Sequence, residues 1–164
     1  MGKRLILMRH AKSAWNDLTL PDHDRPLNPR GERGALALGR WLRVGGYLPD
    51  QALVSTARRT VETFVGLSLP LQPVLDPRLY LADEAQLLAC LREARGDCVL
   101  LIAHNPGIGA LAGDLLRAPV ANPRFHDYPT GATLVAEFPT ERWDLLDPGT
   151  GTALDFALPR DLTD

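Results

Sequence analysis

The sequence predicts a three-layer α/β/α domain with a mostly parallel central sheet. Short apolar runs, which are typical of buried strands, alternate along the chain with segments of helical periodicity. The clearest strand is the run Cys-Val-Leu-Leu-Ile-Ala at residues 98–103. The clearest helix follows it, with apolar residues at Ile108, Leu111, Ala112 and Leu115. Such alternation is typical of a parallel sheet covered by helices on both faces.

Length and composition are those of an ordinary globular domain. The 164 residues fit a single domain over residues 1–164, with 45% hydrophobic and 23% charged residues. A net charge of −2 gives the whole chain no nucleic-acid or anionic-membrane signature. Its apolar runs fall short of the roughly 20 residues that a membrane span needs. Cys90 and Cys98 suit a compartment where disulfides are rare, so we expect a cytoplasmic protein without nucleic-acid or membrane partners.

The amino-terminal part begins with a strand and a long polar segment. Residues 3–8 form a mostly apolar run that predicts a buried strand. Residues 12–30 are rich in Asp, Pro and Asn, and loops of this length are often functional. A helix is expected over residues 29–44, because Asn28 is a suitable N-cap and Pro29 suits the first helical position.

The middle of the chain predicts one further strand and two helices. Residues 52–55 form a short strand, and a helix follows over residues 57–65. Three prolines within residues 70–77 predict an extended connection, because proline is excluded from a helix interior. Asp83 or Glu84 begins the next helix.

After the strand at residues 98–103, a turn at residues 104–107 leads into the helix described above. Residues 132–138 predict a further strand. Residues 143–146 and 153–156 predict two short edge strands.

Three predicted strands end on residues that can bind phosphate. The first ends on Arg9 and His10, the second leads to Arg58 and Arg59, and the third ends on His104. Ligands of open α/β sheets bind beyond the carboxyl ends of the strands. Arginine is permanently charged and matches a phosphate group with two parallel hydrogen bonds. We therefore expect two imidazoles and at least two arginine guanidinium groups to meet at a site for a phosphate-bearing ligand.

Five segments together resemble a known family. They are LILMRHAKSAWN, DRPLNPRG, STARRTVET, AHNPG and PTGAT, and they span nearly the whole chain. This combination resembles the histidine phosphatase superfamily, and within it the small SixA-like phosphohistidine phosphatases. The resemblance implies a phosphoglycerate mutase-like fold and a phosphatase that works through a phosphohistidine intermediate.

The resemblance also implies roles for four residues. His10 would be the nucleophile that accepts the phosphoryl group, and Arg9 would hold phosphate oxygens beside it. Arg59, directly before Thr60, occupies the family's arginine position. His104 would be the second pocket histidine and would donate to the phosphate. No metal or other cofactor is expected, because guanidinium and imidazole groups supply the positive charge.

Other positions match the family less closely. Asn16 corresponds to a polar pocket position of many relatives, and we expect it to bind substrate together with Lys12 and Ser13. Two positions depart from the pattern: Ala11 stands where many members have Gly, and Lys12 where many have Glu.

The general acid of the superfamily's phosphomonoesterases and mutases has no clear counterpart. In those enzymes a central inserted segment supplies a carboxylate, and the corresponding stretch here, about residues 75–84, is short. Asp83 and Glu84 are the nearest candidates, with capping of a helix as their alternative role.

The lack of a clear general acid indicates which class of substrate to expect. General acid catalysis contributes about a hundred- to ten-thousand-fold in rate, and an alkoxide leaving group depends on it. The imidazole that leaves phosphohistidine titrates at roughly pH 6.5 and needs less help. We therefore expect a phosphorylated protein of the histidine-phosphotransfer type as the substrate. A phosphatase for small phosphoesters, with Asp83 or Glu84 as the acid, and a non-catalytic phosphoprotein-binding module are the alternatives.

Overall fold

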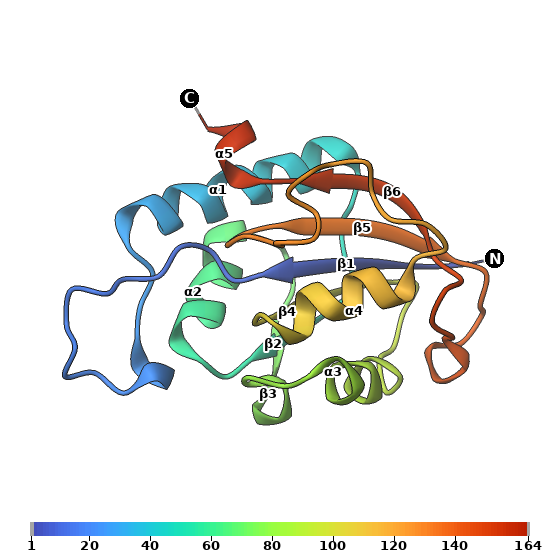
Figure 1. The fold of residues 1–164 in the computed structure, drawn as a ribbon, viewed down its shortest axis with the longest axis horizontal. Coiled ribbons are helices and arrows are strands. Elements are labelled where there is room, and N and C mark those ends of the chain that lie inside the picture. Colours follow the sequence, from blue (N-terminus) through green and yellow to red (C-terminus); the bar gives the residue numbers. More distant parts are fainter. Residues whose placement is uncertain (1, 164) are drawn as a thin grey trace.

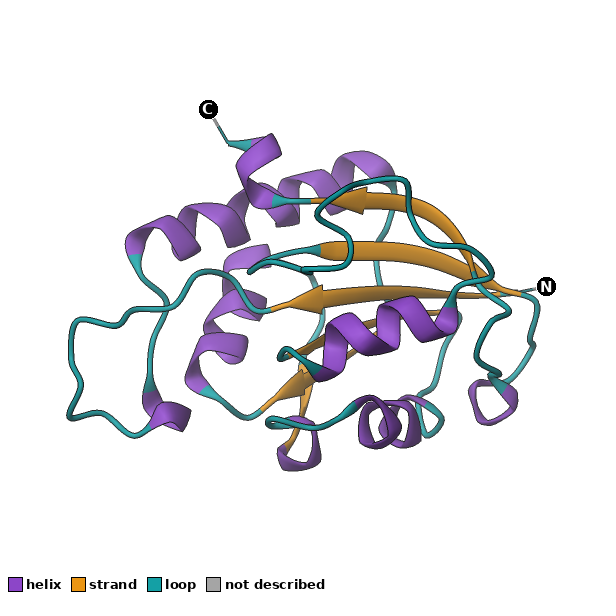
Figure 2. Cartoon of the chain, viewed as in Figure 1, coloured by secondary structure: helices purple, strands orange, loops and turns teal. Residues whose placement is uncertain are grey.

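The computed structural model describes residues 2–163 and has a central sheet between two layers of helices (Figure 1, Figure 2). The strands are β1 (Lys3–Arg9), β2 (Gln51–Ser55), β3 (Pro73–Asp76), β4 (Cys98–Ala103), β5 (Thr133–Phe138) and β6 (Thr152–Ala157). The α-helices are α1 (Pro29–Gly45), α2 (Arg58–Leu67), α3 (Glu84–Leu91), α4 (Gly107–Leu115) and α5 (Pro159–Leu162). Three short 3₁₀ turns, η1 (Asp22–Asp24), η2 (Pro77–Leu79) and η3 (Trp143–Leu145), complete the described elements.

The strand order is β3-β2-β4-β1-β5-β6, and the first four strands run parallel. Strand β5 runs antiparallel to both of its neighbours, β1 and β6. Strands β5 and β6 follow each other in sequence without a crossover helix, which is the connection expected for an antiparallel pair. The sheet is therefore mostly parallel, and the predicted three-layer α/β class is confirmed. Figure 1 shows that the long segment between β1 and α1 extends beyond the carboxyl end of β1.

The core lies on both faces of the sheet, because β1 is buried on both sides. Leu5 and Leu7 belong to a cluster with side chains of α3 and α4. Ile6 and Met8 point to the opposite face and pack with side chains of α1 and α2. Successive strand residues face opposite sides, so one continuous apolar run supplies both layers of the core.

The predicted helix starts are confirmed by their caps. The side chain of Asn28 accepts a hydrogen bond from the Gly31 backbone N–H at 2.8 Å, at the start of α1. Asp83 accepts one from the Gln86 N–H at 2.9 Å and is the N-cap of α3. Each cap satisfies one of the backbone donors that a helix leaves unpaired at its first turn.

In the less regular segments one predicted element was wrong and two elements were missed. The edge strand expected over residues 143–146 is the turn η3, where the Trp143 indole is buried and donates to the Gly96 carbonyl at 2.8 Å. Strand β3 was missed within the proline-rich connection. It is a four-residue edge strand that starts on Pro73, a position where proline is tolerated. The short helix α5 was also missed.

Residues 2–163 contain neither a membrane-spanning helix nor a cluster of metal-ligating side chains. No helix in this part of the chain is long and apolar enough to cross a membrane. No group of three or more His, Cys, Asp or Glu side chains is arranged there to hold a metal ion.

Candidate active site

The carboxyl ends of β1, β2 and β4 bring the predicted phosphate-binding residues together. Arg9 pairs with Ala103 across β1 and β4, so His10 and His104 follow on adjacent strands. Their ring centroids lie 5.3 Å apart. Arg59, from the first turn of α2 after β2, approaches the Nδ1 atom of His104 to 3.3 Å. Both histidines and Arg59 are buried, with exposed fractions of 5% or less.

Two glycines of the family-like motifs allow close approaches around the site. A Cβ atom on Gly31 would lie 2.0 Å from the Lys12 carbonyl oxygen, so only glycine lets α1 pass this close to the segment after His10. A Cβ atom on Gly107 would lie 2.0 Å from the Ala82 carbonyl oxygen. These motifs therefore hold backbone segments around the cavity, and the chemistry comes from their neighbours.

His10 is held in the tautomer that a nucleophile needs. Its Nδ1 atom lies 2.7 Å from the Ala11 carbonyl oxygen, which can only accept, so Nδ1 carries the proton. The Nε2 atom then bears a lone pair. Burial, together with the charges of Arg59, Arg9 and Arg25, lowers the pKa of His10 to about 3, although the bond to Ala11 opposes the shift. His10 is therefore neutral and nucleophilic at physiological pH.

Threonines of α2 fix the position of Arg59 relative to His10. Thr60 donates its hydroxyl to the Ser55 and Ala57 carbonyls, both at 2.7 Å, and ties the start of α2 to β2. Thr63 donates to the Arg59 carbonyl at 2.7 Å and accepts from the Ala11 backbone N–H at 3.0 Å. The helix with the arginine and the segment with the nucleophile are thus linked directly.

His104 is a neutral hydrogen-bonded link in the free protein. An amino group of Arg59 donates to Nδ1 of His104, so its Nε2 atom carries the proton and donates to the Ser55 hydroxyl at 2.8 Å. Burial, with smaller contributions from His10 and Arg59, lowers the pKa of His104 to about 3. The role implied by the resemblance, donation to a phosphate, therefore requires His104 to take up a proton when the anion binds.

Arg9 and Arg59 each keep an unused donor. Arg9 donates one amino group to the Tyr128 carbonyl at 3.2 Å. Burial, and then the neighbouring Arg59, lower the pKa of Arg9 from its ordinary value. The Nε atoms of Arg9 and Arg59 are buried without a hydrogen-bond partner within the described residues. Unpaired buried donors are costly, and an anionic oxygen would satisfy them.

Asp22 is a site residue that the sequence interpretation did not assign. Its carboxylate accepts from Arg59 at 3.0 Å and Arg25 at 2.9 Å, and from the Tyr80 hydroxyl at 2.5 Å. Partial burial would raise the pKa of Asp22, but these hydrogen bonds and charges outweigh it and hold the pKa far below its usual range. Burial, and then the bond to Asp22, raise the pKa of Tyr80.

Sequence offered no direct signal for this role of Asp22. The residue lies in the polar segment 12–30 with its partner Arg25, whereas Arg59 comes from α2 and Tyr80 follows the turn η2. Only the unusual length of that segment marked it as functional.

The cavity lined by His10, Arg59 and His104, which we call the active-site cavity, has a volume of about 400 Å³. Lys12 and Ser13 line it, as does Trp15, whose ring lies 3.6 Å below the guanidinium of Arg25. Arg25 also donates to the Ser13 hydroxyl at 2.8 Å. Asn16 is exposed and is not among the lining residues.

The carboxylates proposed as a general acid lie outside the cavity. Neither Asp83 nor Glu84 lines it; both are exposed, and Asp83 caps α3. Asp22 is the one carboxylate among the lining residues within 2–163, and its lowered pKa keeps it ionised. The cavity thus combines a neutral imidazole that has a free Nε2 lone pair and several cations, and its lining residues within 2–163 include no carboxylic acid that holds a proton near pH 7.

Comparisons with known proteins agree with this geometry. The sequence profile of the histidine phosphatase superfamily (branch 1) matches residues 5–80. An uncharacterized protein of Mycobacterium tuberculosis is 35% identical over 161 residues, covering 93% of this chain and the whole of the relative.

Two solved structures are similar over almost the whole chain. A protein of Nakamurella multipartitia assigned as the phosphohistidine phosphatase SixA has a TM-score of 0.84 and 29% identity, and the match covers 97% of both chains. A protein of Agrobacterium tumefaciens with the same assignment has a TM-score of 0.78 and 25% identity, covering 97% of this chain and all of that one.

Proposed function

Because this chain belongs to the histidine phosphatase superfamily and is SixA-like, we propose that it dephosphorylates phosphohistidine on a protein. The observation that carries the proposal is the composition of the cavity. It presents a neutral nucleophile, His10, together with the half-buried Arg9 and the buried Arg59, and its one lining carboxylate within residues 2–163 is ionised. Such a site suits cleavage of a bond whose leaving group does not depend on a strong acid.

The reaction proceeds in two displacements. The Nε2 lone pair of His10 attacks phosphorus, and the P–N bond to the substrate imidazole breaks as that imidazole takes a proton from solvent. Water then attacks phospho-His10, which returns neutral His10 and inorganic phosphate. Arg9 and Arg59 stabilise the phosphoryl oxygens in both steps through their guanidinium groups.

His104 changes state when the phosphoryl group binds. A dianion beside the ring favours the imidazolium form, so binding raises the pKa of His104 from its low value in the free protein. The added proton lies on Nδ1, the atom that otherwise accepts from Arg59. His104 and Arg59 then donate to the phosphoryl group together.

The cations of the site supply the positive charge that a metal ion would otherwise bring, so we propose a metal-independent hydrolase. The two described cysteines, Cys90 and Cys98, are free thiols. This suits the reducing cytoplasm, where phosphohistidine proteins would be met.

A direct comparison of substrates tests the proposal. Phosphate release is measured from a histidine-phosphorylated phosphotransfer protein, from phosphoserine and from a sugar phosphate, at equal concentrations. We expect the phosphohistidine protein to be hydrolysed fastest. Faster release from the ordinary phosphoesters would contradict the substrate class. Loss of phosphoester hydrolysis in the Asp83→Asn or Glu84→Gln variant would support a small-molecule phosphatase instead. Tight binding without release would indicate a binding module.

A further inference from the structure

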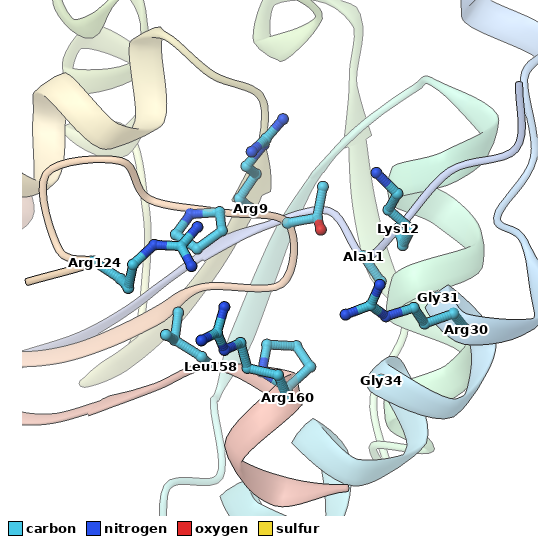
Figure 3. A pocket seen from close by; sticks show the side chains of 12 residues that line it. Arg9, Ala11, Lys12, Arg30, Gly31, Gly34, Arg124, Leu158 and Arg160 are labelled. Carbon is cyan, nitrogen blue, oxygen red and sulfur yellow. The ribbon is translucent and has the colours of Figure 1, made fainter.

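A second cavity, of about 320 Å³, lies beside the active-site cavity and is strongly basic (Figure 3). We call it the basic pocket and define it by its five cationic lining residues, Arg9, Lys12, Arg30, Arg124 and Arg160. Among residues 2–163, none of the other residues that line it is acidic. The whole chain carries a net charge of −2, so this concentration of positive charge is local.

Three of these cations point into the basic pocket from separate parts of the chain. Figure 3 shows the guanidinium groups of Arg30, Arg124 and Arg160 turned toward a common space. They come from α1, from the segment before β5 and from α5. Residues distant in sequence thus supply one site.

The charges of the basic pocket are largely unpaired. Within residues 2–163, Lys12, Arg30 and Arg160 have no ion-pair partner. Arg124 pairs with Asp127 through Nε at 3.2 Å, which leaves its two terminal amino groups available. Like charges around one cavity repel each other, and an anionic ligand relieves that repulsion.

The basic pocket and the active-site cavity are neighbours with shared walls. Arg9, Lys12 and Thr130 line both. A molecule whose phosphoryl group lies against His10 can therefore extend past Arg9 and Lys12 into the basic pocket.

We propose that the basic pocket binds a second anionic group that the substrate carries beside its phosphoryl group, namely the carboxylate of an acidic side chain near the phosphorylated histidine. This inference rests on the proposed function and names a feature that its protein substrate must have. The catalytic arginines hold the transferred group, and the basic pocket selects among phosphorylated proteins by the charge beside it.

The test compares matched substrates and matched variants. The substrates are a phosphohistidine peptide flanked by Asp and Glu, the same peptide with Asn and Gln, N-acetyl-phosphohistidine amide, which has no carboxylate, and a small sugar bisphosphate as a non-peptide anion. The test variant is Arg30→Gln with Arg160→Gln, which removes two exposed cations of the basic pocket. The control is Arg95→Gln with Arg117→Gln, which removes two exposed cations lining other cavities.

The wild-type protein and the control variant should prefer the acidic peptide over the neutral one by about tenfold in kcat/KM, as expected for two exposed ion pairs. The test variant should lose that preference and hydrolyse N-acetyl-phosphohistidine amide at the wild-type rate. An equal preference in the test variant and the wild type would overturn the inference, as would a wild-type preference for the bisphosphate over the acidic peptide.

A binding measurement separates failure of this inference from failure of the proposed function. The probe is the acidic peptide with a non-hydrolysable phosphonate in place of phosphohistidine, followed by fluorescence anisotropy. Weaker binding to the test variant than to the control supports the basic pocket whether or not turnover is seen. Equal binding to both overturns it. Absence of phosphate release from every substrate by the wild type would instead count against the proposed function.

Discussion

Arginines line both the active-site cavity and the basic pocket, but they differ in burial and in ion pairing. In the active-site cavity, Arg59 and Arg25 are buried and share the carboxylate of Asp22. In the basic pocket, Arg30 and Arg160 are exposed and have no ion-pair partner among the described residues. The two regions share Arg9 and Lys12, so the difference arises within a short distance.

This difference corresponds to two tasks. Buried, hydrogen-bonded cations are fixed before the substrate arrives, which is what stabilisation of a transition state requires. Exposed cations without partners keep conformational freedom and attract anions over a longer range, which suits recognition and association. Changes in the active-site cavity should therefore lower activity toward all substrates, whereas changes in the basic pocket should affect only substrates with a second anionic group.

Replacement of His10 should have the largest effect. The His10→Ala variant lacks the nucleophile, and we expect kcat to fall by about ten-thousand-fold or more on every substrate. Stopped assays of phosphate release measure this, with His126→Ala as a control that removes an exposed histidine outside both cavities. Substantial turnover by His10→Ala would remove the nucleophile assignment.

Replacement of Arg59 by lysine should come next. Lysine keeps the charge but lacks the planar fork that contacts Asp22 and His104. We expect kcat/KM to fall by about 100- to 1,000-fold for acidic and neutral substrates alike. Arg58→Lys is the matched control, because Arg58 is exposed and pairs with Glu62 at 3.0 Å. Equal activities of the two variants would contradict the role of Arg59.

Acid should destabilise the protein through the active-site cavity. Since the pKa of His10 is about 3 in the folded protein and about 6.5 in the unfolded chain, the unfolded chain binds more protons between these values. Stability therefore falls as the pH drops below about 6.5, by up to about 2 kcal/mol at pH 5 from this residue. Urea unfolding at pH 7 and pH 5 should show a smaller loss for His10→Asn than for the wild type; equal losses would disprove the account.

Neutralisation of Asp22 should have a moderate effect. In the Asp22→Asn variant, Arg59 and Arg25 lose their shared negative partner, and we expect kcat/KM to fall by about tenfold through less exact positioning of Arg59. The pKa of Asp22 is lowered, so its contribution to stability is present above about pH 4 and is lost as the pH falls further. Asp24→Asn in the same turn is the control. A rise in activity would show instead that Asp22 competes with phosphate for Arg59.

The smallest expected effect is the salt dependence of the basic pocket. An increase in ionic strength from about 0.05 M to about 0.5 M should lower kcat/KM for the acidic peptide severalfold, because exposed charges are screened. The neutral peptide should respond less. Equal salt dependence of kcat/KM for both peptides in the wild type would contradict the recognition role of the basic pocket.

The sequence predicted those parts of the site that follow from strand ends. His10, His104 and Arg59 directly follow or lie near the ends of parallel strands, and parallel strands end at one edge of a sheet, so their meeting is a consequence of topology. The buried strand at residues 98–103 has the predicted bounds because an apolar run with polar ends leaves little choice of register.

Other features depend on contacts between distant segments. Asp22 lies in the short turn η1, and only the folded chain shows that Arg25, Arg59 and Tyr80 surround it. The basic pocket combines α1, α5 and the segment before β5, which no local pattern connects. Residues 143–146 were predicted as an edge strand, but Trp143 lies in a turn where its indole donates to the Gly96 carbonyl, a contact that no local pattern predicts.

The central claim is that a phosphoryl group passes from a protein histidine to His10. Radiolabelled phosphohistidine protein is mixed with the wild-type protein or with His10→Ala, quenched in alkali within milliseconds, and the enzyme is isolated and mapped by peptide analysis. The account predicts a transient, acid-labile label on the peptide that contains His10, and no label on the variant. A label on another residue, or a label that persists in His10→Ala, would contradict it.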